Sequence, residues 1–180
     1  TPLMYAVRDE KTTQALLKFK PDVNIVDDQK WSALMYAVSE YSDSAAVVEM
    51  LLKKRAVVDV RNSDGNTALH LVVKGWGVTN AVKLLLEANA DVNAVNGLGE
   101  TPLMLCRDVS VAELLVKSGA NVDAADLSGR TALMRGCTGY GSDSHLKVKL
   151  LLNAKANPDI QDNEGDNVLI LAATSDSNQK

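Results

Sequence analysis

Residues 67–93 read TALHLVVKGWGVTNAVKLLLEANADVN, and three short blocks in this stretch decide the fold. The first block, Thr67-Ala68-Leu69-His70, is typical of a helix start, because a Thr hydroxyl accepts an otherwise unpaired backbone N–H of the first turn. The second block, Leu84-Leu85-Leu86, predicts a helix whose apolar side is too wide for one surface, so it is expected to be buried between neighbouring units. Asn89 then predicts the end of that helix, because Asn accepts the left-handed conformation of a C-cap.

The first block recurs along the whole chain at a period close to 33 residues. Its copies begin at Thr1, Ser32, Thr67, Thr101, Thr131 and, in a degenerate form, Asn167, which are separated by 31, 35, 34, 30 and 36 residues. Leu pairs or triplets and an Ala-Asn-Val-Asp type of block follow the anchors in the same order. A fixed period of this length is the signature of a repeat architecture.

Between the repeats lie four-residue segments that are rich in Asn, Asp, Ser and Gly and so predict tight turns. Each unit is therefore expected to form a helix, a turn, an antiparallel helix and a hairpin-like loop, and stacking of units supplies the core. The predicted fold class is an all-α repeat solenoid of stacked antiparallel helix pairs. The units are predicted at about 1–31, 32–66, 67–100, 101–130 and 131–166, with a partial unit at 167–180.

These three blocks resemble the T-P-L-H-x-A, double-Leu and G-A-D-V-N signatures of the ankyrin repeat family, and the resemblance covers the whole chain. It implies a slightly curved stack whose inner helices and hairpin tips form a concave face that binds protein partners. Most copies depart from the family by placing Met where it favours His, which leaves His70 as the copy that keeps the scaffold histidine. Lys30 replaces the loop glycine, so the first hairpin is expected either to be distorted or to pack differently.

The composition argues against several other functions. The net charge is −4 with Lys and Arg scattered along the chain, whereas binding to nucleic acid requires a clustered basic face. No apolar run approaches the length of about 20 residues that spans a membrane. Cys106 and Cys137 are expected to be reduced, buried thiols, which fits an intracellular and cytoplasmic location. No metal, cofactor or catalytic motif is recognisable, so we expect neither cofactor nor enzymatic activity.

The partner-binding prediction rests on residues that the repeat itself does not dictate. Trp31, Leu98 and Leu127 are apolar residues on hairpin tips that are expected to be exposed to solvent. Exposed aromatic residues are frequent hot spots of protein binding. For Trp76 the alternative is packing on the neighbouring repeat, and for Arg135 the alternative is an ion pair within the chain rather than with a partner carboxylate. The predicted partner-binding residues are Trp31, Tyr41, Asn66, Trp76, Leu98, Glu100, Leu127, Arg130, Arg135 and Tyr140.

Both ends of the chain lack a capping repeat, so they are expected to expose apolar faces. From this we expect either a piece of a longer protein or self-association through the ends. The leading hypothesis is a non-catalytic module that presents its concave face to a protein or peptide. The alternative is a regulatory or targeting segment of a larger enzyme or channel.

Overall fold

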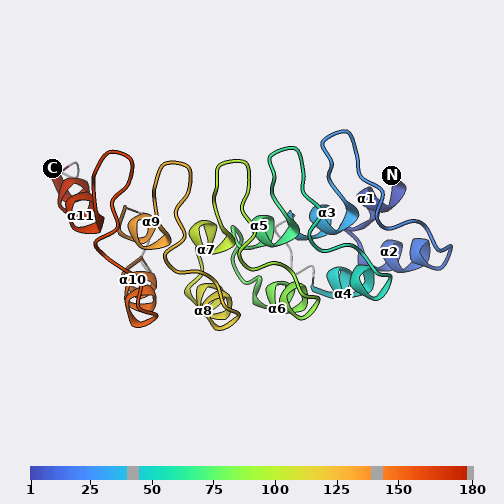
Figure 1. Cartoon of the computed structure of the whole chain (residues 1–180). Helices are drawn as coiled ribbons and strands as arrows, with labels where there is room; N and C mark the ends of the chain where they lie inside the picture. The colour runs from blue at the N-terminus through green and yellow to red at the C-terminus, as the bar shows by residue number, and fades with distance from the viewer. Residues whose placement is uncertain (40–44, 139–143, 178–180) are drawn as a thin grey trace.

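The computed structural model describes residues 1–39, 45–138 and 144–177, which form a linear stack of helices in two layers, with the two ends of the chain at opposite ends of the stack (Figure 1). The inner layer contains α1 (Pro2–Ala6), α3 (Ala33–Ser39), α5 (Ala68–Val72), α7 (Pro102–Leu105), α9 (Ala132–Thr138) and α11 (Val168–Ser177). The outer layer contains α2 (Glu10–Leu17), α4 (Ala45–Lys53), α6 (Thr79–Glu87), α8 (Val109–Lys117) and α10 (Ser144–Asn153). No strand is assigned within the described ranges. The predicted all-α repeat fold is confirmed.

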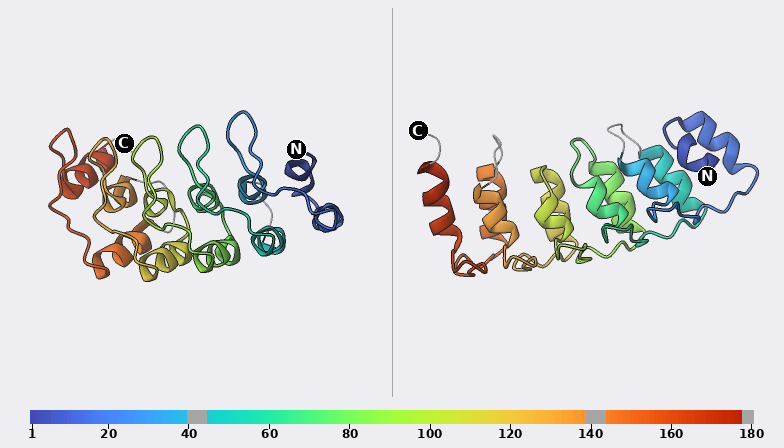
Figure 2. Two further views of the ribbon diagram at one scale, coloured as in Figure 1. Left: turned by 45° about the vertical axis from the view of Figure 1, so that its right-hand side comes forward. Right: turned by 90° about the horizontal axis from the view of Figure 1, so that it is seen from above.

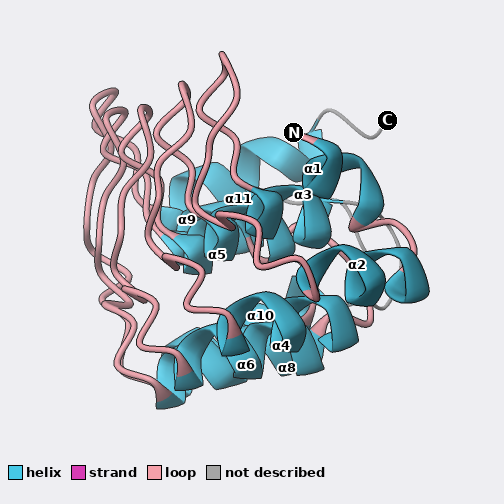
Figure 3. Cartoon of the chain, turned by 90° about the vertical axis from the view of Figure 1, so that its right-hand side faces the viewer, coloured by secondary structure: helices cyan, strands magenta, loops and turns pink. Residues whose placement is uncertain are grey.

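The hairpin loops project from one edge of the helix layers and line up along the stack (Figure 2). Seen along the stack, the row of hairpins rises beside the inner helices, while the outer helices lie on the side away from the hairpin tips (Figure 3). The hairpins and the inner helices thus form two adjoining walls that run along the stack. Side chains on these two walls are the ones that a partner lying along the stack would contact.

A row of equivalent leucines forms the core between the two layers. Leu51, Leu85, Leu115 and Leu151 come from successive outer helices, and all four are fully buried. Leu69 and Leu103 of the inner helices are equally buried in the same cluster. Burying a Leu side chain stabilises the fold by roughly 1.5–3 kcal/mol, so this row is a main source of cohesion between repeats.

Each hairpin is built around an Asp or Asn at its first turn position. The Oδ1 atom of Asp126 accepts hydrogen bonds from the backbone N–H groups of Ser128 and Arg130, at 2.8 Å and 3.0 Å. The equivalent side chains that accept in the same way are Asp27, Asn62, Asn96 and Asp162. The recurrent loop Asp and Asn residues are therefore scaffold residues that fix the turn.

Neighbouring hairpins are hydrogen-bonded to one another through their backbones. The N–H of Leu127 donates to the carbonyl oxygen of Leu98 at 3.0 Å, and the N–H of Asn163 donates to that of Ser128 at 3.0 Å. A second seam runs beside the outer layer, where Oδ1 of Asn93 accepts from the N–H of Asn121 at 2.7 Å. These links repeat along the stack and hold the hairpin wall in a fixed register.

The expected distortion of the first hairpin is wrong. Lys30 adopts φ 58°, in the same left-handed region as Gly65 at 78° and Gly129 at 78°. Its N–H donates to the carbonyl oxygen of Asp27 at 2.9 Å, the bond that Gly129 makes to Asp126. The side chain of Asp27 holds the turn with two backbone N–H groups, so the turn forms even though lysine is poorly suited to this conformation.

His70 has the scaffold role that was predicted for it. The ring is fully buried, with Nδ1 2.9 Å from Oγ1 of Thr67 and Nε2 3.0 Å from the carbonyl oxygen of Glu100 in the next repeat. Where Met replaces this His, the hydrogen bond to the Thr at the start of the same repeat is weaker. The sulfur of Met104 accepts the N–H of Thr101 at 3.4 Å.

Apolar side chains are exposed at both ends of the described stack, as expected for ends without polar caps. Tyr5 and Phe19 are largely exposed at the first repeat, and so is Leu169 in α11.

Candidate partner-binding groove

The fourth repeat is the shortest of the complete units, and a groove lies over it. Thr101 and Thr131 are 30 residues apart, and α7 has four residues where α9 has seven. Three residues connect α7 to α8, so this repeat lacks the extended turn that Trp76 occupies between α5 and α6. The resulting groove has a volume of about 910 Å³ and is bordered by repeats three, four and five.

Four of the residues predicted to bind a partner line this one groove. They are Trp76, Glu100, Arg130 and Arg135. Trp76 is 64% exposed, so the alternative in which its ring packs on the neighbouring repeat is wrong. The groove therefore combines a large exposed aromatic surface with guanidinium groups, the two side-chain types most enriched at binding hot spots.

Arg135 connects the inner helix α9 to two hairpins. Its Nη2 atom lies 2.8 Å from Oε1 of Glu100 and 2.6 Å from Oδ2 of Asp126, so the ion pair within the chain that was weighed for this residue is present. Burial works to raise the pKa of Asp126, but the hydrogen bonds from Arg135 and from two backbone N–H groups outweigh it and hold that pKa below its usual value. Asp126 therefore stays ionised and fixes the guanidinium at the groove wall.

Arg130 is held more loosely at the same wall. Its Nε atom lies 3.3 Å from Oδ2 of Asp162 on the next hairpin, and 42% of the Arg130 side chain is exposed. Asp162 is the buried member of this pair, with 1% of its side chain exposed, so a partner carboxylate would approach the pair from the side of the exposed Arg130 guanidinium.

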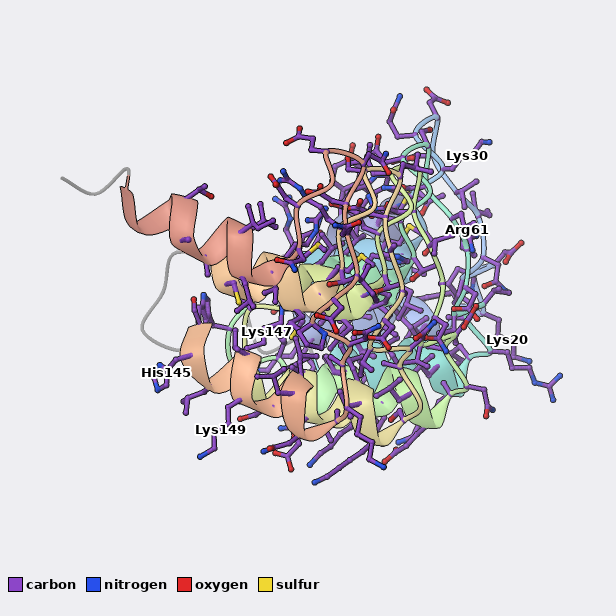
Figure 4. All side chains as sticks on the ribbon, turned by 60° about the vertical axis from the view of Figure 1, so that its left-hand side comes forward. Lys20, Lys30, Arg61, His145, Lys147 and Lys149 are labelled. Atoms are coloured by element: carbon purple, nitrogen blue, oxygen red, sulfur yellow. The ribbon has the colours of Figure 1, made fainter. Side chains whose placement is uncertain are left out.

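Lys147 lines the groove although it is a buried lysine. It lies on α10 four residues before the buried Leu, at the position that Thr13 occupies in α2 and that Val47, Ala81 and Val111 occupy in α4, α6 and α8. Lys147 is only 7% exposed, and its Nζ atom donates to the carbonyl oxygen of Cys106 at 2.6 Å. In Figure 4 it lies between the helix layers, whereas His145 and Lys149 project outward from the same helix. Burial lowers the pKa of the Lys147 amine, because a charged group loses its hydration.

The remaining predicted residues that the structure describes lie outside the groove. Leu98 and Leu127 occupy adjacent hairpin tips, 64% and 72% exposed, and form a small apolar pair on the hairpin wall. The expectation that Trp31 is exposed on a hairpin tip is wrong, because it lies partly buried at the base of the first hairpin. Its ring packs on Tyr36 with centroids 5.2 Å apart. Tyr41 and Tyr140 fall outside the described residues.

Asn66 and Glu100 are buried, which corrects the expectation that they are exposed on the hairpin tips. Their exposed fractions are 7% and 8%, because the bases of adjacent hairpins close over them. Nδ2 of Asn96 donates to Oδ1 of Asn66 at 3.1 Å and to Oε2 of Glu100 at 2.8 Å. Both side chains hold neighbouring hairpins together in this structure.

The cysteines and carboxylates carry no sign of a chemical site. Both cysteines are free, and burial raises the pKa of the Cys106 thiol to about 11, which disfavours the reactive thiolate. No group of three or more metal-ligating side chains is found among the described residues. No described helix has the length and apolar character that crossing a bilayer requires.

Comparison with known proteins agrees with the stacked hairpins and helix pairs. A profile of three ankyrin repeats matches residues 1–62, 42–126 and 79–144. The chain belongs to the ankyrin repeat family. Ankyrin repeats are in general protein interaction modules.

Among curated ankyrin relatives, the mouse neurogenic locus notch homolog protein 1 is 35% identical over 139 residues, and the chicken nuclear factor NF-kappa-B p105 subunit is 34% identical over 143 residues. Each match covers 74% of this chain, but 5% and 14% of those proteins. The crystal structure of the ankyrin repeat protein EF0377 superposes with a TM-score of 0.84 over 98% of this chain and 92% of that one, at 22% identity, which shows the common fold.

Sequence reasoning missed three cationic residues that line the groove, namely Lys74, Arg107 and Lys147. Two signals were present in the sequence. The spacing of 30 residues marks the fourth unit as short, and a lysine four residues before the core Leu of α10 places a charge in a column that is otherwise Thr, Val or Ala.

Proposed function

We propose that this ankyrin stack binds a protein or peptide partner in the groove over the fourth repeat and does no chemistry on it. The observation that supports this most directly is that Trp76, Arg130 and Arg135, three residues singled out for different reasons, line one groove. A groove of about 910 Å³ is at the upper end of the volumes that bind small ligands, and its open shape suits a segment of chain.

Trp76 is expected to contribute most to the affinity. Trp76 is 64% exposed in a turn between α5 and α6, so a partner can cover it without moving the helices. Truncating a central aromatic residue of an interface weakens binding by about 2 kcal/mol, roughly 30-fold. The Leu98 and Leu127 pair extends the contact along the hairpin wall and is expected to contribute about 1 kcal/mol.

The test begins with affinity capture on the immobilised chain, followed by titration of the recovered partner against purified variants. Trp76→Ala is expected to weaken binding about 30-fold while the circular dichroism spectrum stays unchanged. Phe19→Ala is the matched control, because Phe19 is an exposed aromatic residue at the end of the stack, away from the groove. Equal loss in both variants, or loss in neither, contradicts the assignment of the groove.

A second candidate is a regulatory or targeting segment of a larger enzyme or channel. What favours it is that the matched repeats make up only 5% and 14% of the two curated relatives. In that case the partner that occupies the groove belongs to the same longer protein. Determining the full reading frame and then titrating its remaining segments against the groove distinguishes the two candidates.

A further inference from the structure

The groove is positively charged although the chain as a whole is negative. The net charge of the chain is −4. The cationic side chains that line the groove are Lys74, Arg107, Arg130, Arg135 and Lys147. Among its described lining residues, Glu100 is the acidic one. A local reversal of sign on an acidic protein attracts negatively charged partners and repels positively charged ones.

Not all of this charge is neutralised within the chain. Arg130 and Arg135 are paired with Asp162, Glu100 and Asp126. Lys74 and Arg107 are exposed, and neither forms an ion pair with a carboxylate in the described part of the chain. Two cations at the rim are thus available to a partner at the cost of side-chain ordering alone.

Two buried groups in the groove have spare hydrogen-bond donors. The amine of Lys147 has three N–H donors, and its one described acceptor is the carbonyl oxygen of Cys106. The Nε–H of Arg135 is buried and has no acceptor among the described residues. Buried donors without acceptors are costly, and a carboxylate satisfies them better than a neutral oxygen does.

The position of Lys147 makes this arrangement specific to one repeat. Three other outer helices carry Val47, Ala81 and Val111 at this point, which have no side-chain donor. The fourth, α2, carries the buried Thr13, whose hydroxyl donates to the carbonyl oxygen of Ala6 at 2.7 Å, so Lys147 is the one cation in this column. The missing turn of the fourth repeat makes the carbonyl oxygen of Cys106 available, because that residue ends α7 in an extended conformation. A lysine is therefore buried beside α7, the shortest of the described inner helices.

We propose that the groove over the fourth repeat takes an extended acidic peptide segment. Its Asp or Glu side chains pair with Lys74 and Arg107 at the rim, one carboxylate reaches Lys147 and the Nε–H of Arg135, and an apolar residue covers the ring of Trp76. This inference deepens the proposed function and rests on it, because it names the chemistry of the partner at the same groove.

The experiment is selection of peptides of about 12 residues from a random display library, since that length spans roughly 40 Å when extended. Peptides retained by the wild-type chain are titrated by fluorescence anisotropy against Trp76→Ala and against the double variant K74Q/R107Q. We expect groove-dependent peptides to be enriched in Asp and Glu. The double variant should bind them about tenfold more weakly, and raising the salt from about 0.05 M to about 0.5 M should weaken the wild-type complex similarly.

Lys147→Met tests the floor of the groove without adding a cavity, and it should reduce affinity for acidic peptides on the order of tenfold. Lys83→Gln is the control, because Lys83 is an exposed lysine on the outer helix α6. Replacing Asp and Glu of a selected peptide with Asn and Gln should abolish its preference for wild type over K74Q/R107Q.

Two failures are distinguishable. If Trp76→Ala weakens binding but the selected peptides are not acidic, the proposed function stands and the acidic partner is wrong. If no retained peptide depends on Trp76, both proposals fail at this groove. Tighter binding of a single-stranded oligonucleotide than of any acidic peptide, lost in K74Q/R107Q, also overturns the peptide assignment.

Discussion

Replacing Lys30 with glycine should stabilise the protein. Lys30 holds φ 58° at the turn position that is glycine in the four later hairpins, at 75° to 85°. A residue with a Cβ atom is strained there, because Cβ approaches the following carbonyl oxygen, and the cost is roughly 1–2 kcal/mol. The side chain of Lys30 is exposed and forms no ion pair among the described residues, so its removal breaks no such pair.

The net gain is smaller than the strain itself. Glycine makes the unfolded chain more flexible, which costs about 0.4–1 kcal/mol. The difference leaves Lys30→Gly with a free energy of unfolding about 0.5–1 kcal/mol above that of the wild type. For a chain of 180 residues this corresponds to a rise in Tm of about 1–4 °C.

The assay is urea unfolding followed by circular dichroism, with a thermal melt alongside. Lys30→Ala is the matched control, because alanine removes the lysine side chain but keeps the Cβ atom, and it should give no gain. Gly65→Ala is the opposite test, since an added Cβ would lie 2.7 Å from the backbone nitrogen of Gly97 at φ 78°, and it should cost more than about 1 kcal/mol. A midpoint for Lys30→Gly at or below that of Lys30→Ala refutes the reasoning.

Three further predictions concern buried polar positions. Burial lowers the pKa of His70 below 6.5, so as the pH falls the unfolded chain binds a proton at this ring before the folded chain does. The free energy of unfolding should therefore decrease as the pH drops from about 7 to 5.5. Urea titrations should show a weaker pH dependence in His70→Met. Met104→His should raise the free energy of unfolding by about 1 kcal/mol, because the ring N–H can donate to the carbonyl oxygen of Arg130. An unchanged melting temperature would contradict this. Lys147→Met should raise the free energy of unfolding by about 1–2 kcal/mol near pH 7. Because burial lowers the pKa of Lys147, this gain should shrink in melts as the pH rises towards 10.5.

The stack was predictable from the sequence because its determinants are local and repeated. Each Thr or Ser start, each Leu run and each Asp or Asn turn works within a few residues of its own position, and five copies in one order support one another. The scaffold role of His70 followed from the resemblance to the ankyrin repeat family. The error at Lys30 arose from weighing the missing glycine alone, when the Asp27 side chain imposes the turn through two backbone N–H groups.

The groove was not predictable in the same way. Its lining is assembled from three repeats, and the contact between Lys147 and Cys106 joins residues 41 positions apart. The burial of Glu100 likewise depends on how closely successive hairpins approach, which no single repeat specifies. Of the predicted contact residues, Trp76, Arg130 and Arg135 were found in the groove with side chains that a partner can reach. Asn66 and Glu100 were found buried between hairpin bases, although Glu100 also lines the groove.

Amide hydrogen exchange of the chain with and without a saturating selected peptide tests the central claim most directly. If the groove over the fourth repeat holds the partner, added protection should be concentrated in residues 74–78, 102–108 and 130–138. The outer helices α4 and α6 should exchange as before. Protection that is confined to the outer helices or to the ends of the stack would contradict the account.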